Sequence, residues 1–272
     1  VSYPALAFLV LIPLVWAGAP TVVPFYVVCL ALLALIGLRF VRQDLRWWVA
    51  LLFLADLPVL NSTLSGSLDL LYILLIFLAW LSYRRWWLSA ALLGLALASK
   101  QIAWYYLPFY LIFIYQQYGF RDTARRLMLA SVLFAALNLP FLVLNAGAWV
   151  AGVLAPVRDP MFPEGAGLIA LSIGNLVPFL PREAYTLLEG LGMVGALLWY
   201  WRWGRARPEA AMVLAVLPLF LAWRSLPSYF YFCALPIALL LAQANSITRT
   251  IADHSAEKLS DKTLFMSGTP LP

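Results

Sequence analysis

The stretch GLALASKQIAWYYLPFYLI, at residues 94–112, decides the architecture, because a lysine and a glutamine interrupt what is otherwise one long apolar run. Basic residues close this run on both sides, with Arg85 before it and Arg121 after it. Cytoplasmic loops carry an excess of Lys and Arg, so a chain with both ends of this run in the cytoplasm must cross outward and return. Lys100 and Gln101 are therefore predicted to form the tip of a helical hairpin.

The two arms of this hairpin, residues 86–99 and 102–118, are short for membrane-spanning helices. At about 1.5 Å per residue they reach about 21 to 26 Å, whereas the hydrocarbon core of a bilayer is about 30 Å thick. The tip is therefore expected slightly below the outer membrane surface. A charge near a helix centre costs roughly 2.5–3.5 kcal/mol on insertion scales, so a residue such as Lys100 usually faces the protein interior or a wet cavity.

The composition of the whole chain agrees with a helical membrane protein. Of the 272 residues, 64% are hydrophobic and only 11% are charged, and the mean hydropathy is +0.90. Repeated apolar runs of membrane-span length are typical of polytopic helical membrane proteins. The net charge of +6 lies in short loops beside these runs, so it does not indicate a nucleic-acid-binding protein.

Positive charges also set the predicted order of the spans. Fourteen of the eighteen Lys and Arg residues lie in clusters that can share the cytoplasmic face, which leaves Lys100, Arg158, Arg182 and Arg224. The predicted fold is all-α, a polytopic transmembrane bundle of about nine spans, with a short interfacial helix in residues 1–18. The transmembrane domain is expected over residues 1–243 and a polar cytoplasmic tail over residues 244–272. The spans are predicted at residues 21–38, 47–60, 68–82, 86–99, 102–118, 127–144, 184–201, 209–223 and 227–243.

Isolated polar residues away from the basic loops map to the outer half of this bundle, and their convergence predicts one cavity that opens away from the cytoplasm. Each also has a structural alternative. Lys100 can extend its ammonium to lipid headgroups, Asp69 can cap its own helix, and Asp56 can satisfy groups freed by a kink at Pro58. The polar set comprises Asp56, residues 61–67, Asp69, Lys100, Gln101, Arg158, Asp159 and Arg224.

Three segments resemble the GT-C superfamily of integral membrane glycosyltransferases, which take a sugar from a polyprenyl-phosphate carrier. The first is SYPALAFLVLIPLVWAG at 2–18, similar to the stretch that ends the first large outer loop. The second is GSLDLLYILLIFLAWLSYRRWW at 66–87, similar to the acid-bearing outer start of a span that closes on a basic loop. The third is residues 94–112, similar to a segment with Gly-Leu-Ala and Ser/Thr-Lys before an apolar stretch with proline.

Bacterial mannosyltransferase-like members of the superfamily are the most similar. The resemblance implies a hexosyltransferase of a bacterial inner membrane that works on the extracytoplasmic side, with a polyprenyl-phosphate-linked sugar as donor and an unspecified acceptor. Departure of a lipid phosphate builds negative charge, which buried cations stabilise. We therefore expect Lys100 and Arg224 to bind the donor phosphate.

The remaining polar residues are candidates for catalysis and for binding the sugar or the acceptor. Asp69 and Asp56 are the candidate catalytic residues, either as the base or as groups that orient the acceptor. No cofactor is certain from the sequence, and a divalent metal held by one of these acids stays open. The residues expected to bind sugar or acceptor hydroxyls are Asn61, Ser65, Ser67 and Gln101.

One departure from the superfamily and two other protein classes remain. The superfamily's catalytic acid commonly precedes the Tyr-Pro stretch, and this chain begins at that stretch, with Tyr3-Pro4-Ala5. Activity is accordingly expected of a full-length protein that includes the first outer loop. A transporter or flippase of lipid-linked sugars would carry polar residues through the full membrane depth. A non-catalytic truncated relative is the other alternative.

Overall fold

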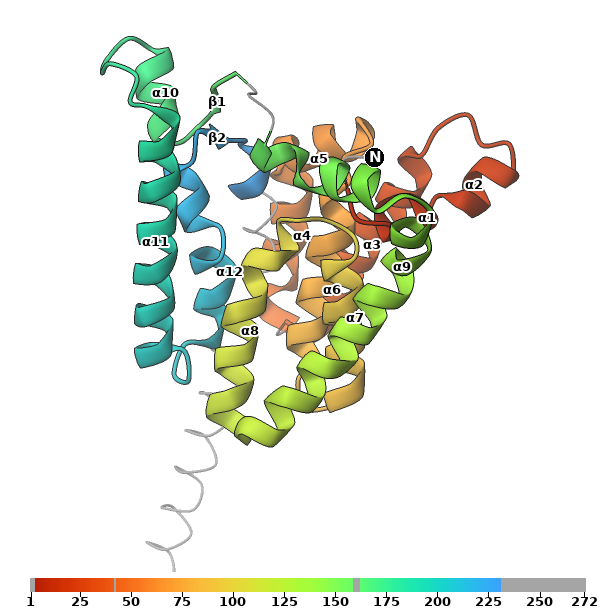
Figure 1. Ribbon diagram of the computed structural model, residues 1–272. Helices are drawn as coiled ribbons and strands as arrows, with labels where there is room; N and C mark the ends of the chain where they lie inside the picture. The colour runs from red at the N-terminus through yellow and green to blue at the C-terminus, as the bar shows by residue number, and fades with distance from the viewer. Residues whose placement is uncertain (1–2, 42, 159–161, 231–272) are drawn as a thin grey trace, which may run out of the picture.

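The computed structural model describes residues 3–41, 43–158 and 162–230, and this part of the chain is mostly helical, with two short strands (Figure 1). The all-α class predicted from the sequence is confirmed. The predicted tail at 244–272 and most of the span at 227–243 lie outside the described residues. The elements are α1 Leu6–Leu9, α2 Ile12–Trp16, α3 Val23–Phe40, η1 Gln43–Leu45, α4 Arg46–Ala55, α5 Leu57–Leu64, α6 Asp69–Leu81, α7 Trp86–Leu97, α8 Ala103–Tyr118, α9 Phe120–Arg158, β1 Glu164–Gly165, α10 Leu168–Ile173, α11 Arg182–Trp203, η2 Pro208–Ala210, α12 Ala211–Leu214, η3 Leu217–Leu221 and β2 Arg224–Ser225.

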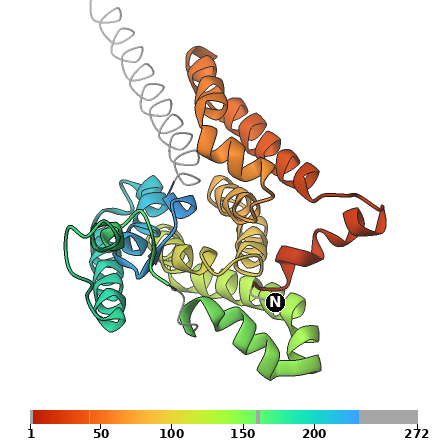
Figure 2. The ribbon, with the colours of Figure 1, turned by 90° about the horizontal axis from the view of Figure 1, so that it is seen from above.

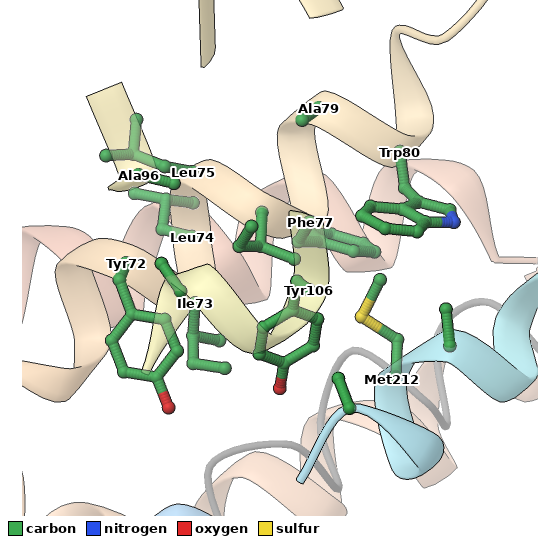
Figure 3. Packing of buried hydrophobic residues seen from close by; sticks show 14 of the residues in the cluster. Tyr72, Ile73, Leu74, Leu75, Phe77, Ala79, Trp80, Ala96, Tyr106 and Met212 are labelled. Carbon is green, nitrogen blue, oxygen red and sulfur yellow. The ribbon is translucent and has the colours of Figure 1, made fainter. Parts of the chain in front are cut away.

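Helix α6 forms the centre of the hydrophobic core. Its sequence DLLYILLIFLAWL is apolar on every side, and such a helix is stable when neighbouring elements surround it. Helices α3, α7 and α8 pack around α6, and Figure 3 shows its side chains together with Tyr106 of α8 and Met212 of α12. Seen from above in Figure 2, the α3–α4 pair and the α10–α12 group lie on opposite sides of these central helices.

The predicted hairpin is present, with α7 and α8 as its arms and Lys100 and Gln101 in the turn between them. Helix α7 also packs closely on α9 through Gly94. A Cβ atom at Gly94 would lie only 2.7 Å from the carbonyl oxygen of Ala130. Glycine is therefore required for this close approach of the two helix backbones.

Helix α9 is longer than the predicted span at 127–144. It continues to Arg158, with a break at Asn145, where φ is −161° and ψ is 88°. The Asn145 side-chain oxygen accepts a hydrogen bond from the N–H of Ala148 over 2.8 Å. This is the bond that an N-cap residue makes, so Asn145 starts a second helical segment at a new angle.

Two other predicted helices are broken in the structure, and proline lies at both breaks. The segment at 209–223 was expected to form one helix, but η2, α12 and η3 divide it, with Pro218 in the first turn of η3. The single interfacial helix expected in residues 1–18 is instead α1 and α2, with Pro13 in the first turn of α2. Proline lacks the N–H that would continue a preceding helix.

Three turns that carry basic clusters gather at the lower end of the molecule in Figure 1. A guanidinium nitrogen of Arg126 donates to the carbonyl of Tyr83 over 2.8 Å, which joins α9 to the α6–α7 turn. The Gln116 side chain donates to the carbonyl of Trp201 over 2.6 Å, which joins the end of α8 to the end of α11. The turn with Lys100 lies at the opposite end of α7 and α8, so the basic turns and Lys100 are on opposite sides.

In the described part of the chain, one helix is long and apolar enough to span a membrane by itself. It covers Phe120–Ala155, and its most apolar window has a mean hydropathy of 2.3 and is only 11% buried. The helices Gln43–Ala55 and Leu57–Leu64 reach that length and composition only together, across a bend of 54°. The core helix of a water-soluble protein is mostly buried, so the exposure of the long helix favours membrane association.

The outward faces of α9 and α11 carry regular apolar stripes. On each helix four of the exposed apolar residues recur at intervals of three, four or seven, which places these four on one face. Exposure of a continuous apolar face of this length to water is unfavourable, whereas its contact with lipid tails is favourable. The exposed residues are Met128, Val132, Leu139 and Val143 of α9, and Leu187, Leu191, Val194 and Leu198 of α11.

Candidate functional site

A buried ion pair joins the start of α6 to the α7–α8 turn. The Lys100 ammonium donates a hydrogen bond to Oδ1 of Asp69, and the two residues are only 8% and 3% exposed. Ser67 donates to the other carboxylate oxygen over 2.9 Å. Each oxygen of Asp69 therefore has a donor, which offsets the cost of burying a carboxylate.

Two aromatic rings flank the Lys100 ammonium. The ring centroids of Tyr3 and Tyr72 lie 5.5 and 5.9 Å from Nζ, distances at which the ring attracts a cation. Tyr3 is held near this position because the N–H of Ala5 donates to the side-chain oxygen of the buried Asn138 over 2.9 Å. The carboxylate and the two rings together hold the ammonium in one place and shield it from bulk water.

A cavity of about 750 Å³ opens beside Lys100. Its volume lies within the range of about 300–1,000 Å³ that is typical of small-molecule sites. The walls come from α8, α9, α11 and the segment around Arg224, and they include apolar residues such as Trp104, Met193 and Leu219. The charged residues in this lining are three cations and one carboxylate, namely Lys100, Arg182, Arg224 and Glu189.

Two of the polar lining residues also hold the cavity walls together. Gln101 donates from Nε2 to the carbonyl of Val153 over 2.9 Å, which ties the α7–α8 turn to α9. Arg224 forms an ion pair with Glu164 over 3.0 Å, alongside the parallel pairing of β1 with β2. At Gly165 of β1 a Cβ atom would lie 2.0 Å from the carbonyl oxygen of Ser225, so only glycine allows the strands to approach this closely.

Several of the residues predicted from the sequence meet at this site. Lys100, Gln101 and Arg224 line the same cavity. Asp69 and Ser67 do not line it. Asp69 pairs with Lys100, and Ser67 donates a hydrogen bond to Asp69, so the two residues hold the Lys100 ammonium in position. This geometry favours a positioning role for Asp69, and its assignment as a catalytic residue stays a prediction.

The other predicted residues lie on the α4–α5 segment and do not line the cavity. Asp56 accepts a hydrogen bond from the N–H of Val59 over 3.2 Å, so it caps α5 at the bend, as the structural alternative proposed. Asn61 and Ser65 are exposed, and the Ser65 hydroxyl donates to the carbonyl of Asn61 over 2.8 Å. In the structure these three residues serve local helix geometry, and their assignments to catalysis and to sugar binding stay predictions.

Sequence reasoning missed Glu189, the carboxylate that lines the cavity. Its Oε1 accepts a hydrogen bond from the Tyr105 hydroxyl over 2.5 Å, and Tyr105 lines the same cavity. The available signal was an acid in the middle of the apolar run at 184–201, where an ionisable residue marks a functional site by default. Arg182, the first residue of α11, was noted as a cation outside the basic loops but received no role.

The described residues offer no group of three or more His, Cys, Asp and Glu side chains that could hold a metal ion. Divalent cations such as Mg²⁺ need several oxygen ligands, and the four charged groups of the cavity lining include only one carboxylate. Lys100 and Arg224 are each paired with a carboxylate, so the lining offers an anion N–H donors rather than a large net positive charge. A cavity with cations on several walls and apolar residues between them can hold an anionic group attached to an apolar chain.

Comparison of the chain with protein-family models, with curated proteins and with solved structures gives no match. The function is accordingly argued from the geometry and chemistry of the cavity. The features that carry this argument are the buried Lys100, the surrounding cations and the apolar outer faces of the helices.

Proposed function

We propose that this chain is an integral membrane glycosyltransferase, which moves a hexose of the mannose type from a polyprenyl-phosphate carrier to an acceptor outside the cytoplasm. The observation that carries the proposal is the cavity in which Lys100, Arg182 and Arg224 come together from distant parts of the chain. The resemblance of residues 2–18, 66–87 and 94–112 to the GT-C superfamily supports the same reaction.

The cations of the cavity would bind the phosphate of the donor. An ammonium has three N–H donors, so the Asp69 carboxylate leaves Lys100 able to donate to a further acceptor. When the bond between the sugar and the phosphate breaks, the phosphate gains negative charge. Cations that are already held in place, as Lys100 is by Asp69 and Arg224 by Glu164, stabilise that charge with little reorganisation, which lowers the barrier.

The membrane arrangement explains why the donor would be a lipid. The basic turns indicate the cytoplasmic side, and the starts of α8 and α11, whose residues line the cavity, lie at the opposite end of the molecule (Figure 1). Nucleotide sugars are cytoplasmic, so a transferase with an outward cavity needs a donor that has been carried across the membrane. The apolar stripes of α9 and α11 support a location in a membrane, and we propose about nine spans in a bacterial inner membrane from the order of apolar runs and basic clusters in the sequence.

Binding of tritium-labelled polyprenyl-phosphate mannose to the protein in liposomes tests this proposal. We expect Lys100→Ala to weaken binding by about 10- to 100-fold, because a hydrogen bond between charged groups contributes about 1.5–3 kcal/mol. Unlabelled polyprenyl phosphate should compete for the site, whereas free mannose should not.

Two further variants separate binding from folding. Asp69→Asn/Lys100→Met removes both charges of the buried pair and should bind as weakly as Lys100→Ala. Arg205→Ala removes an exposed charge at the basic end and should bind like the unaltered protein. Unchanged donor binding in both Lys100 variants, or no binding by the unaltered protein, would contradict the proposed function.

A further inference from the structure

Helix α11 presents two different faces, and Glu189 lies on the one that lines the cavity. Arg182, Thr186, Glu189 and Met193 line the cavity and follow one another at intervals of four, three and four residues. The apolar stripe that begins at Leu187 is exposed on another face of the same helix. The phase of the helix therefore directs Glu189 toward the cavity rather than toward lipid.

Glu189 lies further along its helix than Arg182 does. Seven residues of helix separate Arg182 from Glu189, which is about 10 Å along the axis. On the facing helix, Tyr105 is the third residue of α8, whereas Lys100 lies in the turn before that helix. Arg182 and Glu189 thus line the same cavity about two helical turns apart on α11, and a cavity of about 750 Å³ is large enough for a sugar ring.

The Tyr105 hydroxyl fixes the orientation of the carboxylate. It donates to Oε1 of Glu189 over 2.5 Å, which leaves Oε2 as the oxygen that can accept from a ligand. A carboxylate accepts hydrogen bonds and protons, and it cannot bind a phosphate directly because both are negative. Glu189 therefore suits the hydroxyl-bearing end of a phosphate-linked sugar, or the acceptor hydroxyl beside that sugar.

We propose that Glu189 is the proton acceptor of the transfer, a role that rests on the proposed function. The acceptor oxygen forms a bond to the anomeric carbon of the sugar while its proton passes to Glu189. The bond between that carbon and the phosphate oxygen breaks, and its electron pair stays on the polyprenyl phosphate, which the cations bind. Proton, sugar and leaving group are thus accounted for without another reactant.

Substitution of Glu189 tests the role in membranes that contain the protein and its natural acceptor. The measured quantity is the loss of label from polyprenyl-phosphate mannose, which reports transfer whatever the acceptor is. Glu189→Gln keeps an oxygen for the Tyr105 hydroxyl but cannot take a proton, and a general base contributes about 10²- to 10⁴-fold. We therefore expect transfer to fall at least about 100-fold with donor binding unchanged. Glu189→Asp should retain partial transfer with a shifted pH profile.

The matched control is Glu183→Gln, which makes the same substitution at an exposed position one to two turns earlier on α11. This control should transfer at the normal rate. Glu189→Gln with normal transfer would overturn the assignment of Glu189, while the donor-binding result for Lys100 would leave the proposed function standing. A protein that fails to bind the donor at all would instead remove the proposed function and this assignment with it.

A second measurement does not depend on turnover. Dicyclohexylcarbodiimide modifies carboxyl groups in apolar surroundings, so it should label Glu189 in the unaltered protein, as detected by mass spectrometry. Polyprenyl-phosphate mannose should protect Glu189 from the reagent by at least about fivefold when its binding site is saturated. Full labelling of Glu189 in the presence of bound donor would show that the sugar does not reach it, which would overturn the assignment.

Discussion

Asp122→Asn is expected to lower the unfolding temperature of the protein in detergent by roughly 6 to 20 °C. Asp122 pairs with the guanidinium of Arg126, which is only 1% exposed and also donates to the Tyr83 carbonyl and the Tyr110 hydroxyl. Removing the carboxylate leaves a buried positive charge without its acid. Breaking a buried pair in this way costs about 3–5 kcal/mol, and each kcal/mol shifts the midpoint by about 2–4 °C at this size.

The effect should depend on the charge that is left behind. The double variant Asp122→Asn/Arg126→Met removes both charges and should recover much of the lost stability, because apolar replacement of a whole buried pair is often neutral. The exposed Glu183→Gln is the matched single-charge control and should leave the midpoint unchanged. An Asp122→Asn protein as stable as this control would show that the bonds of Arg126 to Tyr83 and Tyr110 do not stabilise the packing of α9 against α8 and the α6–α7 turn.

The Asp69–Lys100 pair should give a different result, in which stability and donor binding separate. Asp69→Asn leaves the Lys100 ammonium buried without its carboxylate, and we expect a loss of about 3–5 kcal/mol in unfolding free energy. Adding Lys100→Met removes the remaining charge and should restore most of that stability. Binding of polyprenyl-phosphate mannose should stay weak in the double variant, because the cation itself is gone.

Thermal unfolding and donor binding measured on the same preparations check this separation. A double variant that is stable and binds the donor normally would show that Lys100 serves the fold alone. A double variant as unstable as Asp69→Asn would show that the unpaired charge of Lys100 is not the cause of the lost stability.

The helices of the core could be predicted from the sequence because each is a continuous apolar run between strong local signals. The Arg84–Arg85 turn and the interruption at Lys100 and Gln101 place the α7–α8 hairpin within a few residues of its observed bounds. Helix α6 follows from the twelve residues after Asp69, which are apolar on every face. Only an element surrounded by others tolerates that pattern, so the sequence also indicates that α6 is central.

The breaks were harder to predict because each depends on a balance between local groups. The kink at Asn145 requires that its side chain cap a new helix, and the same residue is compatible with an ordinary loop. The pairing of Glu164 with Arg224 joins residues far apart in the chain, and no local pattern specifies it. The division of 209–223 into short helices depends on how Pro218 packs as well as on its missing N–H.

The candidate site was predicted in part for the same reason. A lysine inside an apolar run must find a partner or a wet cavity, so Lys100 stands out from sequence alone. Asp56, Asn61 and Ser65 stand out equally, but capping a helix needs the same residue types as binding a sugar, and the structure places them at helix ends. Glu189 is an acid within the apolar run at 184–201, but only the fold shows that it bonds Tyr105 and lines the same cavity as Lys100.

The central claim is that the cavity opens on the side of the membrane opposite to the basic turns. Single cysteines at Thr186 in the cavity and at Arg205 in a basic turn test it, in a protein whose native Cys29 and Cys233 are replaced by Ala. With a membrane-impermeant maleimide on intact cells, we expect Thr186→Cys to be labelled and Arg205→Cys to react only after the membrane is permeabilised. Labelling of both positions from the same side would contradict the account. Labelling of Thr186→Cys from both faces would instead indicate a transporter.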